Sequence, residues 1–237
     1  MSEIIKLSRS TVEKYLSCPR CCVLDKKHQI KPPSLPFTLN IAVDTLCKNE
    51  FDYYRRIQEP HPLFIEKGID AVPFQHKNLE RWRSNFQGIR YKSIEHHYDF
   101  GGAVDDIWQK ANGDLVVVDV KATSRNNFDW SETFNKYEYA KAYKRQLEMY
   151  QWLFRKNGFK VANEAYLLYF NGKKNLEVFN NQLNFDVHLI RLDCCTAWVE
   201  QKIIDTVNLL RSDTFPKSSS NCEYCNYLKK RWKLSRS

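Results

Sequence analysis

One carboxylate and one ammonium share a face of an otherwise apolar segment. Residues along Leu115-Val116-Val117-Val118-Asp119-Val120-Lys121 point alternately to opposite faces of a strand, so Asp119 and Lys121 project together. A carboxylate inside a valine-rich strand must be compensated for its lost hydration, and a divalent metal ion can supply that compensation. The alternative is an ordinary ion pair at the end of a strand.

A second carboxylate is expected beside the first. The dipeptide Asn112-Gly113 predicts a β-hairpin between this strand and the one before it. A three-residue loop, 111–113, places Asp105 directly opposite Asp119, whereas a two-residue loop places Asp106 there. Either register gives two carboxylates beside a lysine, which is a hard oxygen site suited to Mg²⁺ or Mn²⁺.

Eight cysteines include two C-x-x-C pairs at opposite ends of the chain, Cys18 with Cys21 and Cys222 with Cys225. These two pairs can supply the four ligands of a tetrahedral Zn²⁺ ion or of a 4Fe-4S cluster. Such a site would hold the two ends of the chain together. The alternatives are four buried thiols without a metal, and a site in which Cys22 replaces Cys21.

The elements that must position these residues alternate between helix and strand. Helices are expected from a capping box at Ser10 and over 39–56, 78–86, 134–156 and 193–211, and strands over 93–108, 115–121, 164–170, 176–180 and 187–192. This order predicts a mixed α/β core with helical flanks. We expect a single domain, 1–237, with a helical N-terminal region (1–92), a catalytic sheet core (93–192) and a C-terminal helix with the second cysteine pair (193–237).

The composition and net charge indicate a globular protein that binds a polyanion. The 237 residues are 43% hydrophobic and 27% charged, and 37 Lys plus Arg against 28 Asp plus Glu give a net charge of +9. Basic residues gather around Trp82 and in the tail, at Lys229, Lys230, Arg231, Lys233 and Arg236. An aromatic ring among cations suits a nucleic-acid backbone. No segment resembles a membrane span or an export signal, so we expect a cytoplasmic protein without a membrane partner.

Three segments in order carry a resemblance to a known family. Gly102-Ala103-Val104-Asp105, then Val118-Asp119-Val120-Lys121, then Gln146-Leu147-Glu148-Met149-Tyr150 resemble the consecutive motifs of the PD-(D/E)XK nuclease superfamily in its RecB-like branch. The resemblance implies a restriction-endonuclease-like mixed β-sheet flanked by helices. It further implies a metal-dependent DNA nuclease, specifically an exonuclease, that hydrolyses phosphodiester bonds.

The resemblance also assigns roles to residues. Asp105, Asp119 and the Val120 carbonyl would bind Mg²⁺ or Mn²⁺, and Lys121 would orient the attacking water or help to deprotonate it. Gln146 and Tyr150 would position the lysine, the metal shell or the DNA backbone. The branch often places a metal-binding histidine on an upstream helix, where this sequence has Asp44, and no role is carried over to that residue.

The two ends of the chain resemble the iron–sulfur nucleases of the same branch, which include the CRISPR-associated adaptation exonuclease and the AddB-type nuclease. This likeness rests on Leu7-Ser8-Arg9-Ser10, Tyr15-Leu16-Ser17-Cys18-Pro19-Arg20 and the C-terminal cysteines. It implies a 4Fe-4S cluster, but those relatives commonly split their cysteines one and three, and the split of two and two here keeps Zn²⁺ as the alternative.

The expected partners are DNA, as single strands or duplex ends, and a helicase or CRISPR adaptation proteins. Two other functions compete with the nuclease. One is a catalytically inactive nucleic-acid-binding module of the same fold, and the other is a zinc-dependent nucleic-acid adaptor.

Overall fold

The computed structural model describes residues 3–235, which divide into two compact units. One unit contains residues 3–36, 92–100 and 197–235, and the other contains residues 37–91 and 101–196. Within the described residues, no helix has both the length and the apolar character needed to cross a membrane.

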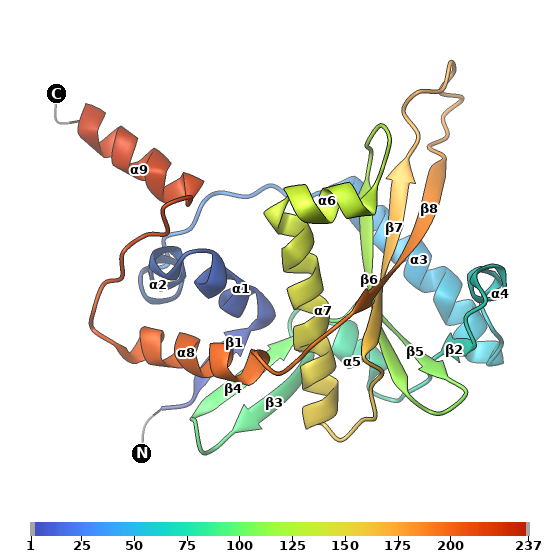
Figure 1. Ribbon diagram of the computed structural model, residues 1–237, viewed down its shortest axis with the longest axis horizontal. Helices are drawn as coiled ribbons and strands as arrows, with labels where there is room; N and C mark the ends of the chain where they lie inside the picture. Colours follow the sequence, from blue (N-terminus) through green and yellow to red (C-terminus); the bar gives the residue numbers. More distant parts are fainter. Residues whose placement is uncertain (1–2, 236–237) are drawn as a thin grey trace. The chain divides into compact units, whose positions relative to one another are not determined.

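The larger unit is built on a five-stranded mixed sheet in the order β2-β5-β6-β7-β8 (Figure 1). The central strands β6 and β7 run parallel, and the other neighbours run antiparallel. The strands are β2 (Ala71–Pro73), β5 (Asp106–Lys110), β6 (Leu115–Thr123), β7 (Glu164–Gly172) and β8 (Phe185–Asp193). Helices flank this sheet, so the predicted mixed α/β core is confirmed.

The long helices α3 (Thr38–Ile57) and α7 (Glu138–Lys156) pack on opposite faces of the sheet (Figure 1). Because side chains alternate between the two faces of β6, each helix contacts a different set of β6 residues. Val116, Val118 and Val120 join the apolar core that contains Cys47 and Phe51 of α3. The intervening residues, Asp119 among them, therefore face α7.

The β5–β6 hairpin has the three-residue loop. Asp106 pairs with Val118, Lys110 and Asp114 close the turn, and Gly113 has a φ of 83°. This register places Asp105 next to Asp119, as the longer loop predicts. The continuous strand expected over 93–108 is wrong, because pairing stops at residues 103–105 between β4 (Tyr98–Gly102) and β5.

The smaller unit contains α1 (Arg9–Ser17), α2 (Pro19–His28), α8 (Val199–Arg211) and α9 (Glu223–Leu234). Strand β1 (Ile5–Ser8) belongs to a three-stranded sheet in the order β1-β4-β3, where β3 is Ile89–Ser93. The capping box of α1 is formed by Ser8 and Thr11, so the start predicted at Ser10 is two residues late. The side chain of Ser8 reaches the free N–H of Thr11, which Ser10, already inside the helix, cannot do.

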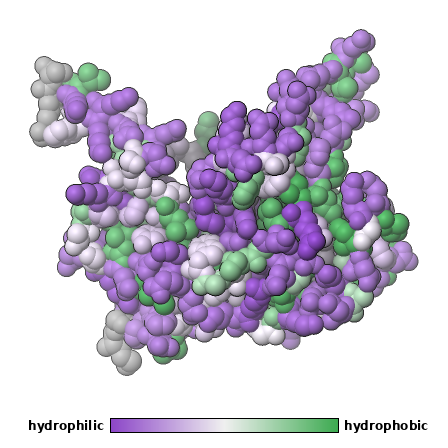
Figure 2. All heavy atoms as spheres, viewed as in Figure 1, coloured by the Kyte–Doolittle hydropathy of each residue, from purple (hydrophilic) through white to green (hydrophobic). Residues whose placement is uncertain are grey.

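Two other local predictions are also corrected. The helix expected over 134–156 is broken at Tyr137, whose extended backbone (φ −118°) separates α6 (Trp130–Lys136) from α7. Residues 176–180 form no strand but belong to the loop between β7 and β8, where Figure 2 shows hydrophobic patches among hydrophilic residues at upper right. The short helices α4 (Pro62–Lys67) and α5 (Leu79–Arg83) complete the larger unit.

The basic clusters also differ from expectation. Trp82 is only 6% exposed, because His76 stacks on its ring and Phe154 and Phe159 pack against its edges. It offers no stacking surface to a nucleic acid. The basic residues of the tail lie on α9, which appears mainly hydrophilic in Figure 2, and Arg236 lies outside the described residues.

Gly88 provides a test of the packing between its own backbone and that of Gly102. Gly88 has a φ of 66°, and a Cβ atom there would lie 2.6 Å from the Gly102 carbonyl carbon. Gly68 has a similar φ of 64° but open space around it. We expect Gly68→Ala to cost about 1–2 kcal/mol of unfolding free energy for the left-handed backbone alone. Gly88→Ala should cost about 1–3 kcal/mol more for overpacking. Urea unfolding of both variants measures the difference, and equal losses would contradict the close approach.

Candidate active site and four-cysteine centre

Asp119 is the buried centre of the predicted site. Gln146 Nε2 donates a hydrogen bond to Asp119 Oδ1 at 2.7 Å, and the Lys121 ammonium forms an ion pair with Asp119 Oδ2. Gln146 Nε2 also donates to the hydroxyl oxygen of Tyr150 at 3.2 Å. Strand β6 supplies the acid and the lysine, and one face of α7 supplies the amide and the phenol. These four predicted site residues therefore lie together.

Asp105 reaches the same place from the break in the β-strand pairing. Its Oδ2 accepts a hydrogen bond from the Val120 N–H at 2.8 Å, one residue beyond Asp119. The Val120 carbonyl lies 3.4 Å from Lys121 Nζ, which donates to it. The unpaired segment 103–105 thus frees the Asp105 side chain to bind the backbone of β6, and all the predicted metal ligands occupy one region.

Asp106, the alternative second carboxylate, has a structural role. Its Oδ1 accepts hydrogen bonds from the guanidinium groups of Arg55 and Arg83 and from the Ile107 N–H. Asp52 bridges the same two arginines. This buried network fixes the start of β5 and turns the side chain of Asp106 away from Asp119.

Two further charged residues of α3 join the site. Lys48 Nζ lies 2.7 Å from Asp44 Oδ2 and 3.5 Å from Asp105 Oδ1. Asp44 Oδ1 is buried and has no hydrogen-bond partner among the described residues. Asp44 had no predicted role, and Lys48 was not among the predicted site residues. Their i, i+4 spacing on the helix expected over 39–56 was the available signal.

The electrostatics follow from burial and mutual contact. Burial, with a smaller contribution from Asp105, raises the pKa of Asp119 to about 7, although Lys121 opposes the rise. Burial lowers the pKa of Lys121, but the carboxylates of Asp119 and Asp105 outweigh it and leave that pKa above its ordinary value. Burial followed by the Asp105 charge raises the pKa of Asp44. Lys121 therefore remains an ammonium at neutral pH.

The residues present fit a hard divalent cation. Asp44, Asp105 and Asp119 provide carboxylate oxygens, which Mg²⁺ and Mn²⁺ prefer, and the Val120 carbonyl is of the same donor class. The buried Oδ1 of Asp44 makes no hydrogen bond within residues 3–235, and a bound cation would give this oxygen a partner.

The four predicted cysteines lie together in the smaller unit. Their Sγ atoms are all within 4.8 Å of one another, with Cys21 at 3.5 Å from Cys222 and 3.4 Å from Cys225. Cys18 starts α2 and Cys222 starts α9, so each pair occupies the first turn of a helix. Cys22 instead lies buried with its thiol 3.7 Å from the Thr11 carbonyl oxygen. The thiol that joins Cys18 in the cluster is therefore Cys21 and not Cys22.

The backbone prepares one of these thiols for ionisation. Burial raises the pKa of Cys18, but hydrogen bonds from the backbone N–H groups of Cys21 and Ser219 outweigh it and lower the pKa to about 7. Burial and the neighbouring thiols raise the pKa of Cys21, and burial raises the pKa of Cys225 to about 11. A bound cation would reverse both rises by stabilising the thiolates.

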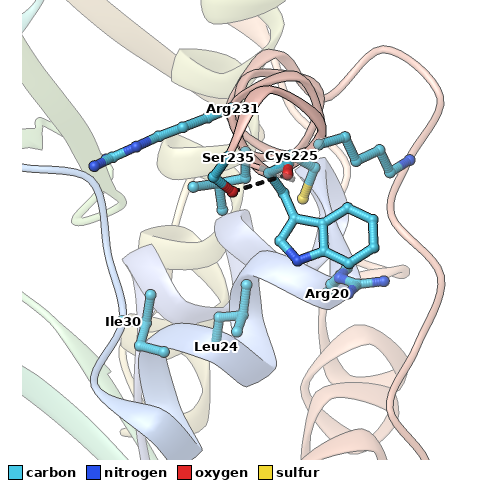
Figure 3. A pocket seen from close by; sticks show the side chains of 9 residues that line it. Arg20, Leu24, Ile30, Cys225, Arg231 and Ser235 are labelled. Atoms are coloured by element: carbon cyan, nitrogen blue, oxygen red, sulfur yellow. Dashed lines mark hydrogen bonds between the residues drawn. The ribbon is translucent and has the colours of Figure 1, made fainter. Parts of the chain in front are cut away.

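A hollow of about 790 Å³ lies between α2 and α9 beside this cluster (Figure 3). Leu24 and Ile30 form one wall and Cys225 lies on the other, near Trp232 and Arg231.

Comparison with known proteins adds a family and two solved structures. A sequence model described as the PD-(D/E)XK nuclease superfamily matches residues 42–229. The crystal structure of SSO0001 is similar with a TM-score of 0.47 and 18% identity, covering 97% of this chain and 86% of that one. The crystal structure of a protein named "Putative exonuclease" from Eubacterium rectale has a TM-score of 0.49 and 12% identity, covering 93% and 86%. No curated protein matches the chain in sequence.

The raised pKa of Asp119 predicts a pH dependence of stability in the metal-free protein. The folded state holds this proton up to about pH 7, whereas an unfolded aspartate releases it near its ordinary pKa of 3.8. Stability must therefore fall as the pH rises from about 4 to about 7, because the folded state binds more protons across that window.

Asp119→Asn isolates this contribution. We expect urea unfolding between pH 4 and pH 8 to show a steeper loss of stability in the wild type than in Asp119→Asn. Parallel curves for the two proteins would contradict the buried, protonated carboxyl.

Proposed function

The chain belongs to the PD-(D/E)XK nuclease superfamily, and on that basis we propose that it is a metal-dependent DNA nuclease that hydrolyses phosphodiester bonds. The observation that carries the proposal is the meeting of Asp105, Asp119 and Lys121 at one point of the sheet, with Gln146 against Asp119. The net charge of +9 favours a polyanionic substrate. Intact acidic residues and lysine argue against an inactive binding module.

We assign the cation to Asp105, Asp119 and the Val120 carbonyl, and we add Asp44 because of its free buried oxygen. A bound Mg²⁺ or Mn²⁺ ion would lower the pKa of water and neutralise charge on the phosphoryl group. The remaining work falls to the side chains of the protein. Gln146 fixes the orientation of the Asp119 carboxylate through the hydrogen bond to Oδ1, and Tyr150 fixes Gln146.

Lys121 acts by charge in this proposal. Its pKa lies above the ordinary value, so the amine holds its proton and can stabilise negative charge that develops on the phosphate oxygens. A role as proton acceptor would require the opposite shift of the pKa. The ring of Tyr143, 4.7 Å from Lys121 Nζ, holds the ammonium in position through a cation–π contact.

The finer assignments remain part of the same proposal. Exonuclease action, membership of the RecB-like branch and a relation to CRISPR-associated or AddB-type nucleases rest on the three motifs and the cysteine-bearing ends of the chain. End-labelled single strands and duplexes of defined polarity, incubated with Mg²⁺ or Mn²⁺, test exonuclease action directly.

Removal of the site's charges should abolish cleavage without unfolding the larger unit. We expect Asp119→Ala and Lys121→Ala each to reduce the rate of DNA cleavage by at least about a hundredfold, because each removes preorganised charge at the reacting phosphate. The rate is measured on labelled DNA at saturating Mg²⁺, and circular dichroism checks the fold.

A matched acid–lysine pair on the same sheet serves as the control. Lys110 Nζ and Glu164 Oε1 lie 2.6 Å apart on β5 and β7, away from the carboxylate cluster. Lys110→Ala and Glu164→Ala should keep the wild-type rate. Wild-type cleavage by Asp119→Ala or Lys121→Ala would refute the nuclease assignment.

For the cysteine centre we propose a single tetrahedral Zn²⁺ ion. Four thiolates bound to one zinc at 2.3 Å lie about 3.8 Å apart, the edge of that tetrahedron. The sulfur contacts of 3.4–3.9 Å fit this spacing. In a 4Fe-4S cluster the four cysteines bind four different irons and must lie farther apart. Spacing therefore favours zinc over the iron–sulfur cluster that the family resemblance implies.

Metal analysis and substitution test this centre together. We expect purified protein to contain one zinc per chain, to be colourless and to melt at a lower temperature when Cys18→Ser or Cys222→Ser removes a ligand. Cys195→Ser, at an exposed cysteine outside the cluster, is the control and should leave the melting temperature unchanged. Brown protein containing iron would overturn the zinc assignment. An unchanged melting temperature in both ligand variants would overturn the structural role.

A further inference from the structure

The active-site face of α7 continues outward as a line of aromatic rings. Tyr139, Tyr143, Gln146 and Tyr150 follow the i, i+4, i+7, i+11 spacing of a single helix face. The ring of Tyr143 contacts that of Tyr139 at a centroid distance of 5.5 Å, and Tyr139 stacks with Tyr137 at 5.4 Å and 28°. The line therefore starts at Lys121 and ends at the break between α6 and α7.

These rings are only half-buried. Tyr137, Tyr139 and Tyr143 all retain exposed surface, whereas Gln146 and Tyr150 at the inner end are buried. The extended backbone at Tyr137 ends α6 and turns this residue toward Tyr139. Their exposed surface is accessible to a ligand that stacks on aromatic rings.

The Arg125 guanidinium lies beside the outer two rings, and the backbone of Arg125 is fixed by Asn171. Its guanidinium carbon lies 4.7 Å from the ring centre of Tyr137 and 5.5 Å from that of Tyr139. The Asn171 side chain accepts from the Arg125 N–H at 2.8 Å and donates to its carbonyl at 3.0 Å. Within residues 3–235, Arg125 forms no ion pair with a carboxylate. Its charge is therefore available to an anion.

A polar hollow opens beside this arginine. Its volume is about 360 Å³, and its lining includes Arg125, Tyr137, Phe128 and Lys174. Strand β6 carries the catalytic candidates and leads directly into the loop that forms the hollow (Figure 1). The hollow, the ring line and the carboxylates thus belong to one continuous region of the larger unit.

We infer that Tyr137, Tyr139 and Arg125 form a stacking platform that holds the unpaired bases of a single strand leading into the carboxylate site. The inference rests on the proposed function and narrows its substrate to DNA with unpaired bases. Flat rings and a guanidinium plane bind any base by its face, and the arginine also attracts the backbone phosphate. Base pairing and stacking hide those faces in a duplex, so a duplex cannot use the platform.

The spacing suits a strand. Seven residues separate Tyr139 from Gln146, a rise of about 10 Å along α7. That length corresponds to about three nucleotides of a stacked strand, at the rise of about 3.4 Å per nucleotide that duplex DNA has. The platform would therefore hold bases a few nucleotides from the scissile phosphate, and its residues are positioning residues that do not touch the reacting atoms.

Fluorescence anisotropy with a labelled oligothymidine and a blunt duplex of the same length tests the platform. All proteins carry Asp119→Ala, which prevents cleavage, so binding is measured independently of activity. We expect Tyr137→Ala and Tyr139→Ala each to weaken binding of the single strand by about fivefold to a hundredfold. Tyr137→Phe and Tyr139→Phe keep the ring and should retain the starting affinity, and the duplex affinity should stay unchanged throughout.

Tyr53 offers a matched control, because Arg56 lies 6.0 Å from the centre of its half-exposed ring on α3. Tyr53→Ala should leave binding unchanged. If Tyr139→Ala lowers the melting temperature, Tyr139→Leu replaces it, since leucine keeps the packing but has no flat face.

Unchanged affinity in the alanine variants, or an equal loss for the single strand and the duplex, would overturn the inference. The platform can fail this test while the wild type still cleaves DNA. Conversely, a wild type without nuclease activity would sink the proposed function and leave the binding result intact.

Discussion

The burial of the Asp119 carboxylate is the constraint on which the larger unit depends. A charged group without water costs several kcal/mol unless partners replace its hydration. Here Lys121 of the same strand and Gln146 of α7 are the partners, whereas the neighbouring Asp105 carboxylate opposes ionisation of Asp119. The ionised acid is therefore stabilised only where strand β6 and helix α7 bring these two partners to it.

A second constraint is the break in strand pairing between Asp105 and Asp106, whose side chains bind different partners although the two residues are adjacent in sequence. Asp106 begins β5 and is bound by two buried arginines, whereas Asp105 lies outside the strand pairing and accepts from the Val120 N–H. The two arginines fix Asp106 at the start of β5, and Asp105 therefore lies just outside the paired part of the sheet. A strand that continued through residue 105 would direct this side chain by simple alternation and would engage its backbone in the ladder.

The sequence predicted the parts of the molecule that depend on local patterns. Alternation in residues 115–121, the Asn112-Gly113 turn and the cysteine spacings correctly indicated β6, the hairpin before it and the four-sulfur cluster, while the choice between a two-residue and a three-residue loop was settled by the structure. It failed where tertiary contacts decide. Trp82 looked like a surface ring among cations but lies beneath His76 in the core, and Tyr137 breaks a segment whose helical periodicity is continuous. The i, i+4 spacing of Asp44 and Lys48 indicated a pair on one helix face, but the contact of Lys48 with Asp105, which is distant in sequence, has no local pattern to report it.

The charge balance of the site connects its composition to its chemistry. When all are ionised, the carboxylates of Asp44, Asp105 and Asp119 carry three negative charges and the ammonium groups of Lys48 and Lys121 carry two positive ones, which leaves one excess negative charge. A divalent cation turns that excess into a net positive charge, and a phosphodiester is then attracted to a site that would otherwise repel it. Because the site contains two lysines, its net charge changes from negative to positive when a single divalent cation binds. With three acids and one lysine, the same cation would leave the site neutral, and the field that draws in the backbone would be lost.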